Sequence, residues 1–299
     1  MPPVSPSAGP ISPPADVCRD SLRGKERAEN FPVALRLLPR AVRTDLRAVY
    51  DVVRTIDDLG DEGDAAARPA GLAAFADDLA RVWTTGEPQA PVLARLVPTV
   101  RRCHLSRDPF DRLVRANIVD QQVDRYETFA DLLGYCDLSA APIGELVLRL
   151  FDRATPERIA LSDRVCAALQ VAEHLQDVGE DRRRGRIYLP QRDMAAFGVA
   201  ESNLDAATTS PALRRLVLAE CDKVTGLLSS GPPLLAELSG WARLAVTGYV
   251  AGGHAAVDGL RRAGGDVLKA SPGVRRRDLA RQLVRTTLAT REAARGAAR

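Results

Sequence analysis

The sequence has few cysteines and no long apolar run, and each shortage excludes a class of protein. Its five cysteines are scattered, odd in number and form no CxxC pair. Neither a disulfide framework nor a zinc site is therefore indicated, and a reducing, cytoplasmic compartment is expected. The longest weakly polar region, residues 244–257, is too short and too rich in glycine to span a bilayer.

An excess of charge is also lacking. Lysine and arginine number 42 against 39 aspartates and glutamates, a net charge of +3. This balance is too even for general attraction to nucleic acid or to an anionic membrane. Nucleic acid is therefore not expected as a partner, and any anion-binding site must be local.

The N-terminal stretch MPPVSPSAGPISPPAD is rich in proline and serine. It lacks the basic start and the apolar stretch of a signal peptide. We expect a disordered leader over residues 1–24, one domain over residues 25–292, and a short Ala/Arg tail over residues 293–299.

Strand-like alternation, internal repeats and nucleotide-binding fingerprints are also missing. Apolar residues recur instead at helical spacing almost throughout, and proline or glycine separates the segments. GYVAGG is not a GxGxxG motif, and no GxSxG motif occurs. The pattern predicts a single-domain all-α protein with roughly ten helices.

Against this background, the segment RTIDDLGDEGD is unusually acidic. Asp57 and Asp61 lie four residues apart, and Gly60 and Gly63 indicate that the helix ends here. At the C-terminal end of a helix, carboxylates are disfavoured by a few tenths to about 1 kcal/mol each. One helical stripe at i, i+4, i+7 and i+11 contains Tyr50, Arg54, Asp57 and Asp61.

The segment QVAEHLQDVGEDRRRGRIYLP has the same arrangement. Asp177 and Asp181 are again four residues apart, and arginines follow them directly. A continuous helix would place Cys166, Gln170, Glu173, Asp177 and Asp181 on one stripe. The spacing thus predicts two helices that share a DxxxD motif.

Each acidic motif has two interpretations, which the residues alone leave open. The first is a solvated helix end, because charged faces are usually exposed. The second is a shared Mg²⁺ ion, which binds carboxylate oxygens together with phosphate oxygens and would remove the repulsion between the acids. Arg54 and the arginines at positions 182–186 would then hold a diphosphate through bidentate contacts.

The residues around both motifs resemble the squalene and phytoene synthase family of head-to-head prenyl synthases. The resemblance rests on RAVYDVVRTIDDLGDEGD, LQVAEHLQDVGEDRRRGRIYLP, ENFPVALRLLPRAVRTDLRAVY, DRYETFADLLGYCDLSAAPIGELVLRLF and YVAGGHAAVDGL, which together span most of the chain. ENFPVA and EHLQDV are most similar to the hydroxysqualene synthase branch of bacterial hopanoid synthesis. The resemblance implies an all-α isoprenoid-synthase fold around a central cavity.

The resemblance also implies residue roles. Asp57, Asp61, Asp177 and Asp181 would bind Mg²⁺, with Asp58 and Glu180 more peripheral. Arg54, Arg186 and Tyr188 would contact the diphosphate, while Tyr50, Tyr135, Gln170 and Tyr249 would line the reaction centre. For Tyr135, ordinary core packing is an equal alternative. The segment SAAPIG, residues 139–144, is interpreted as a helix break that gives a long prenyl chain room.

Two residues of the second motif depart from the squalene and phytoene pattern. Glu173 replaces the usual asparagine and Gln176 the usual arginine, as fits the hopanoid branch. We hypothesise that Glu173 completes a Mg²⁺ shell or orients the water that captures a cation; the alternative is a surface glutamate paired with arginine. His174 points about 100° away from Glu173 on a helix. With His104 and His254 it is interpreted as structural.

The implied reaction is the Mg²⁺-dependent conversion of presqualene diphosphate to hydroxysqualene. Alternatives within the family are squalene, presqualene diphosphate or phytoene synthesis from two prenyl diphosphates. A non-catalytic scaffold or nucleic-acid binder, and a degenerate member assisting a partner synthase, leave the paired aspartates unexplained. Whether the chain associates with the inner membrane face for product release stays open.

Overall fold

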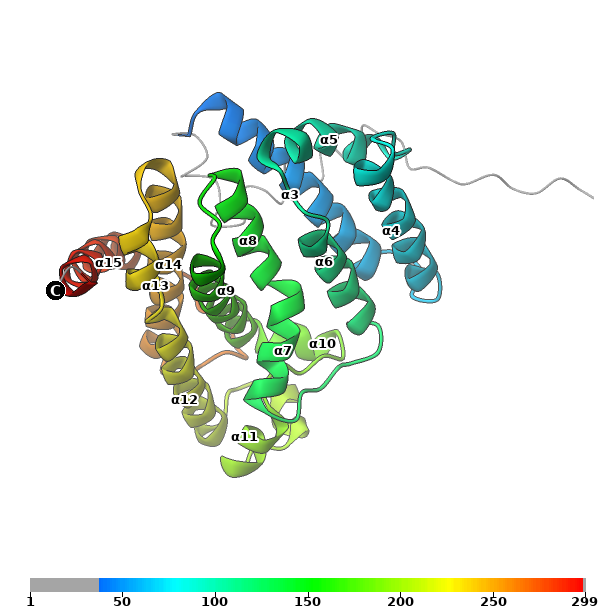
Figure 1. The fold of residues 1–299 in the computed structure, drawn as a ribbon. Helices are drawn as coiled ribbons and strands as arrows, with labels where there is room; N and C mark the ends of the chain where they lie inside the picture. The colour runs from blue at the N-terminus through cyan, green and yellow to red at the C-terminus, as the bar shows by residue number, and fades with distance from the viewer. Residues whose placement is uncertain (1–37, 298–299) are drawn as a thin grey trace, which may run out of the picture. The chain divides into compact units, whose positions relative to one another are not determined.

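The protein is built from helices alone in the part that the computed structural model describes, residues 38–297. This range holds thirteen α-helices and one 3₁₀-helix, with no β-strand beyond an isolated bridge between Arg125 and Ile187. The all-α prediction is confirmed (Figure 1). The predicted leader, residues 1–24, lies outside the described residues, and the domain limits stay a prediction.

The helices follow one another with short connections. They are α3 (Arg40–Asp61), α4 (Arg68–Thr84), α5 (Pro91–Cys103), α6 (Asp108–Val119), α7 (Phe129–Ser139), α8 (Ala141–Leu150), α9 (Pro156–Gln176), α10 (Val178–Arg183), α11 (Gln191–Ala196), η1 (Glu201–Asp205), α12 (Pro211–Leu228), α13 (Gly231–Glu237), α14 (Gly240–Arg262) and α15 (Arg276–Ala297). None of them is long and apolar enough to cross a membrane.

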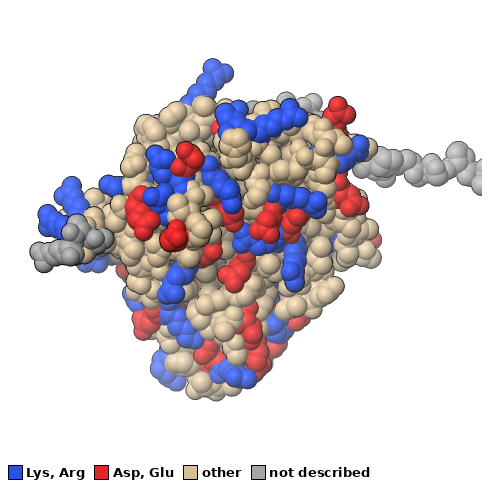
Figure 2. Space-filling view, in the orientation of Figure 1, with Lys and Arg blue, Asp and Glu red and all other residues tan. Residues whose placement is uncertain are grey.

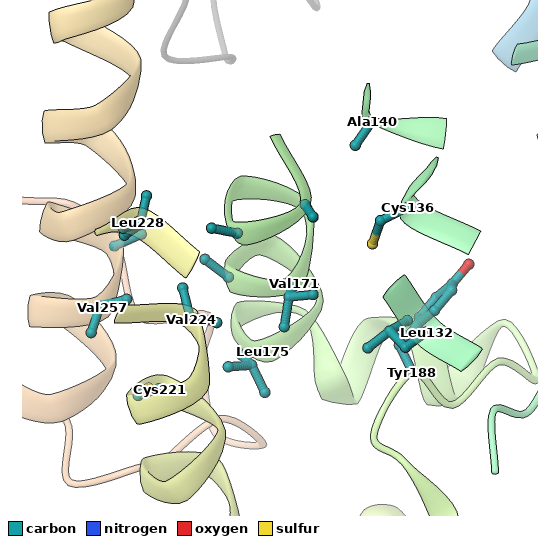
Figure 3. Packing of buried hydrophobic residues seen from close by; sticks show 14 of the residues in the cluster. Leu132, Cys136, Ala140, Val171, Leu175, Tyr188, Cys221, Val224, Leu228 and Val257 are labelled. Atoms are coloured by element: carbon teal, nitrogen blue, oxygen red, sulfur yellow. The ribbon is translucent and has the colours of Figure 1, made fainter. Parts of the chain in front are cut away.

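Helix α9 is the central element, and it packs against α7, α8, α12, α13 and α14. It begins where the Thr155 hydroxyl accepts a hydrogen bond from the Arg158 backbone N–H, with Pro156 in the first turn. Figure 3 shows Val171 and Leu175 of α9 between Tyr188 on one side and Val224 of α12 on the other. A helix buried on several faces is expected to carry apolar residues around most of its circumference, and α9 does.

The predicted helix break after Ser139 is confirmed. Helix α7 ends at Ser139, α8 begins at Ala141, and the intervening Ala140 is buried. Gly144 follows in α8, where a Cβ atom would lie 2.6 Å from the Cys166 Sγ of α9 and closer still to the Ser162 hydroxyl. The glycine therefore permits close contact between α8 and α9.

Helix α15 packs on α13 and α14 with a polar face. Its buried side chains among residues 276–296 are Asp278, Gln282, Thr286 and Thr290, which recur every four residues. The Gln282 amide donates to Asp258 of α14 at 2.6 Å. Val284 and Leu288 are more than half exposed. The buried face of α15 is thus polar, and ion pairs and a hydrogen bond connect it to α14.

Charges of both signs are interspersed over the face that Figure 2 shows. One acid, Asp163 of α9, is partly buried, and no hydrogen-bond donor among the described residues reaches its Oδ1. Burial raises the pKa of Asp163 to about 6; Arg112 opposes this shift, whereas Asp137 and Glu145 add to it. The ionised carboxylate is thus disfavoured in the folded protein.

We expect Asp163→Asn to stabilise the protein at neutral and higher pH. Because the folded pKa is raised, the wild type loses stability as pH rises from about 4, the ordinary aspartate value, through about 6. Removing the charge should raise the free energy of unfolding by about 1 kcal/mol near pH 8 and change it little near pH 4.5. Urea denaturation at both pH values measures this, with the exposed Asp77→Asn as control. An equal effect at both pH values would contradict it.

Candidate active site

The first aspartate motif ends helix α3, as the sequence predicts. Asn117 of α6 donates from its amide to the Asp57 Oδ1 at 3.3 Å, and Gln121 donates to the Gly60 carbonyl at 3.0 Å. Burial raises the pKa of Asp57 to about 6; the Asn117 amide and Arg54 oppose the shift, while Asp61 and Asp58 add to it. A buried carboxylate with a raised pKa is stabilised when it binds a proton or a cation.

Gly60 allows this close approach of α6 to the motif. A Cβ atom at Gly60 would lie 2.9 Å from the Asn117 Cγ and closer still to its Oδ1. We expect Gly60→Ala to move Asn117 off Asp57 and to lower the free energy of unfolding by about 1–3 kcal/mol. Chemical denaturation measures the change.

The matched control for this variant is Gly226→Ala in α12, where nothing lies within 4 Å of the added Cβ. There alanine should be neutral or stabilising by up to about 1 kcal/mol, because it favours the helix. If the Gly60→Ala protein were as stable as the Gly226→Ala protein, the Asn117 side chain would be able to move aside without lowering the free energy of unfolding, and the prediction would be wrong.

The second motif is not on one continuous helix, so that prediction is wrong. Helix α9 ends at Gln176, Asp177 leaves the helical conformation with φ −106° and ψ 16°, and α10 begins at Val178. The cause is a distant segment. The Gln176 amide donates to the Pro272 carbonyl at 2.5 Å, and the Ser271 hydroxyl donates to Asp177 at 3.0 Å. The predicted stripe therefore stops at Glu173, and Asp181 stands on the next helix.

Arg186 connects the two motifs. Both terminal nitrogens of its guanidinium lie 3.2 Å from the Asp61 Oδ1, and its side chain is only 18% exposed. Gly185, at φ 85°, supplies the turn after α10 that directs Arg186 toward α3. The other arginines of the run differ: Arg182 pairs with Glu201 and Asp205, and Arg184 with Glu180.

Aromatic rings gather next to this link. The rings of Tyr126, Tyr135 and Tyr188 have centroids 5.4–5.8 Å apart. The Tyr135 hydroxyl donates to the Asp120 Oδ2 at 2.8 Å, while the Asp120 Oδ1 is buried with no hydrogen-bond donor in the described protein. Tyr135 is also 8% exposed and part of the core, which confirms the packing interpretation, while its place in a reaction centre stays a prediction.

His174 is a site residue that the sequence reasoning missed. Its ring stacks on Tyr188 at a centroid distance of 3.6 Å, its Nε2 lies 3.2 Å from the Gln170 amide nitrogen, and its Nδ1 lies 3.5 Å from the Asp181 Oδ2. It thus contacts three residues of the predicted site. The sequence indication was its spacing of four from Gln170, which places the two side chains on one face of a helix.

The remaining predicted residues lie on helices α3, α9 and α14. Arg54 forms an ion pair with Asp58 at 2.8 Å. Tyr50 lies close enough to Arg54 to affect the pKa of Arg54. Tyr249 of α14 lies near Cys166 of α9, and burial raises the pKa of Tyr249. Glu173 is exposed to solvent. Asp120 and Asn117 were not predicted, since a polar residue near a helix end gives no distinct signal.

The aspartates suit a hard cation in their donor chemistry. Residues 38–297 hold no ready cluster of three or more His, Cys, Asp or Glu side chains for a metal ion. Mg²⁺ usually binds through one or two carboxylates together with phosphate oxygens and waters. The Asp181 Oδ2 fits that role, because it is buried and accepts no hydrogen bond from the described residues. The donor set therefore fits Mg²⁺, and its binding stays a prediction.

Comparison with known proteins agrees with the fold and with the motifs. Residues 25–282 match the model of the squalene/phytoene synthase family. The chain belongs to that family, and it is an enzyme of this class.

Three similar proteins illustrate the relationship. The hydroxysqualene synthase of Rhodopseudomonas palustris is 35% identical over 217 residues, 71% of this chain and 72% of that protein. The 15-cis-phytoene synthase of Synechococcus elongatus is 32% identical over 233 residues, 72% of this chain and 74% of that protein. The crystal structure of squalene synthase HpnC from Alicyclobacillus acidocaldarius is 37% identical, with a TM-score of 0.76 over 83% of this chain and 93% of that one.

Proposed function

We propose that the protein converts presqualene diphosphate to hydroxysqualene and inorganic diphosphate in a Mg²⁺-dependent reaction. The observation that carries this proposal is the contact of Arg186 with Asp61 beside the stacked rings of Tyr188 and His174. A basic group between two acidic motifs suits a metal-bound diphosphate, and adjacent aromatic faces suit a cation. The similarity to a hydroxysqualene synthase supports this choice of product.

The metal would be held by Asp57 and Asp61 from one side and by Asp177 and Asp181 from the other. Bound Mg²⁺ supplies Lewis-acid stabilisation of the negative charge that develops on the leaving diphosphate. Arg186 would bind oxygens of the diphosphate, because a guanidinium recognises phosphate bidentately. Arg54 would keep the carboxylates of α3 oriented through its ion pair with Asp58.

The aromatic residues would stabilise the organic cation that is left behind. Tyr126, Tyr135 and Tyr188 are buried, and they present ring faces with negative electrostatic potential. The Asp120 carboxylate holds the Tyr135 hydroxyl, which keeps that ring in place. Burial among these rings also excludes bulk water, so the cation lives long enough to rearrange before one water captures it.

A second candidate is synthesis of squalene, presqualene diphosphate or phytoene from two prenyl diphosphates. The similarity to a phytoene synthase supports this candidate. The sequence identity to that enzyme, 32%, is close to the 35% identity to the hydroxysqualene synthase. These reactions use the same ionisation step and differ in the acceptor or in the need for a hydride donor.

The test is incubation of the purified chain with presqualene diphosphate and Mg²⁺, with and without NADPH, followed by identification of the products by mass spectrometry. We expect hydroxysqualene in both incubations and none when the metal is chelated. Squalene formed only with NADPH would establish the second candidate instead. Product formed only from farnesyl or geranylgeranyl diphosphate would place the chain at the condensation step.

A further inference from the structure

His174 connects a predicted metal ligand with a predicted residue of the reaction centre. Its ring lies between the amide nitrogen of Gln170, 3.2 Å from Nε2, and the Asp181 Oδ2, 3.5 Å from Nδ1. The stack on Tyr188, with an interplanar angle of 13°, fixes the plane of the ring. These contacts hold both ring nitrogens and one ring face.

The contact with Gln170 selects one tautomer of the neutral ring. An amide nitrogen can only donate, so the Nε2 that faces it must accept. A neutral imidazole carries one proton, so the proton is then on Nδ1, which lies 3.5 Å from the Asp181 Oδ2 without forming a hydrogen bond to it. The orientation of the Gln170 amide and the tautomer of His174 are therefore coupled: an amide nitrogen that faces Nε2 requires the proton on Nδ1.

The surroundings leave His174 little freedom to adopt another position. Leu132, Val171 and Leu175 line the small void next to the ring, which measures about 10 Å³. This is at the lower limit for a single water molecule. The void therefore offers little space into which the imidazole could move.

We propose that His174 is a positioning residue that fixes the Gln170 amide with its nitrogen toward the imidazole and its carbonyl oxygen free to accept. The role of this oxygen rests on the proposed function: it accepts a hydrogen bond from the water that captures the cation. The water oxygen donates its lone pair to the carbon, the C–O bond forms, and the released proton passes to the departed diphosphate. Residue 174 thereby influences the proportion of alcohol among the products.

The first experiment measures the tautomer without any substrate or metal. The chain has three histidines, so ¹⁵N-histidine labelling gives a simple NMR spectrum, and His174→Gln identifies the signals of His174. In the neutral form of the His174 ring we expect the proton on Nδ1. A proton on Nε2 would overturn the proposal, because the amide of Gln170 would then have to face the ring with its oxygen.

The second experiment measures products with two variants. His174→Phe keeps a ring to stack on Tyr188 but removes both nitrogens, whereas His174→Gln keeps a polar group that can reach Gln170. For His174→Phe we expect the ratio of alcohol to other cation-derived products to fall about fivefold, equivalent to about 1 kcal/mol between competing barriers. Diphosphate release should change less, and His174→Gln should recover part of the alcohol.

The control is His254→Gln in α14, and thermal denaturation checks that each variant is folded. A purely structural role would lower the turnover of His174→Phe without changing the product ratio, and that result would overturn the proposal. If the wild type forms no alcohol at all, the proposed function fails along with the role of the water. If the wild type forms alcohol and His174→Phe forms the same fraction, only the role of His174 fails.

Discussion

Asp57→Asn is expected to lower kcat/KM by at least about 100-fold while making the metal-free protein more stable. The loss of activity follows because an amide is a poor ligand for Mg²⁺, and metal stabilisation of a leaving group contributes several kcal/mol. The gain in stability follows from the pKa of Asp57, which burial raises to about 6. Because this pKa lies above its unfolded value, ionised Asp57 costs stability as pH rises through about 6, and asparagine removes that cost.

Steady-state assays of diphosphate release and urea denaturation without metal measure the two effects near pH 8. Asn117 keeps a partner in this variant, because the new amide oxygen can still accept its hydrogen bond. Asp77→Asn in α4, an exposed aspartate, is the control and should change neither quantity. A variant that loses both activity and stability would show that Asp57 is needed for the fold rather than for a cation.

Arg186→Gln should lower kcat/KM by about 100-fold and weaken the binding of inorganic pyrophosphate in the presence of Mg²⁺. In the described structure Arg186 faces Asp61 with both terminal nitrogens and is mostly shielded from solvent. Its removal leaves one fewer positive charge next to the carboxylates of α3, where the proposed function places the phosphates of the substrate. Calorimetric titration with pyrophosphate separates this binding effect from the chemistry.

The control is Arg192→Gln in α11, whose side chain is 71% exposed and pairs with the exposed Glu127. It carries the same change of charge near the same region and should leave both binding and turnover unchanged. An Arg186→Lys variant should recover only part of the binding, because an ammonium group lacks the bidentate geometry. Equal loss in Arg186→Gln and Arg192→Gln would assign the effect to net charge alone.

Local spacing was sufficient to predict the helical class, the end of α3 at the first motif and the break between α7 and α8. Each of these depends on residues within a few turns of one another. The interruption of the second motif at Asp177 was not predictable in this way. It depends on Ser271 and Pro272, which lie 94 and 96 positions from their partners along the chain.

Among the site residues, too, local spacing predicts some, and contacts between distant parts of the chain determine others. Asp57, Asp61 and Asp181 are conspicuous because like charges at helical spacing need a compensating partner. Asp120 and His174 acquire their importance from contacts made by the folded chain, with Tyr135 in one case and with Tyr188 in the other. A single sequence does not show which buried rings such groups will meet.

Helix α15 is attached to α14 partly through polar contacts that water can replace. Of its buried side chains, Asp278 pairs with Arg262 of α14 and Gln282 donates to Asp258 of α14, and water can replace both contacts. Fraying of the helix would exchange these polar contacts for contacts with water. Because Ser271 lies in the segment that leads into α15 and also holds Asp177, such fraying would reach the second aspartate motif directly.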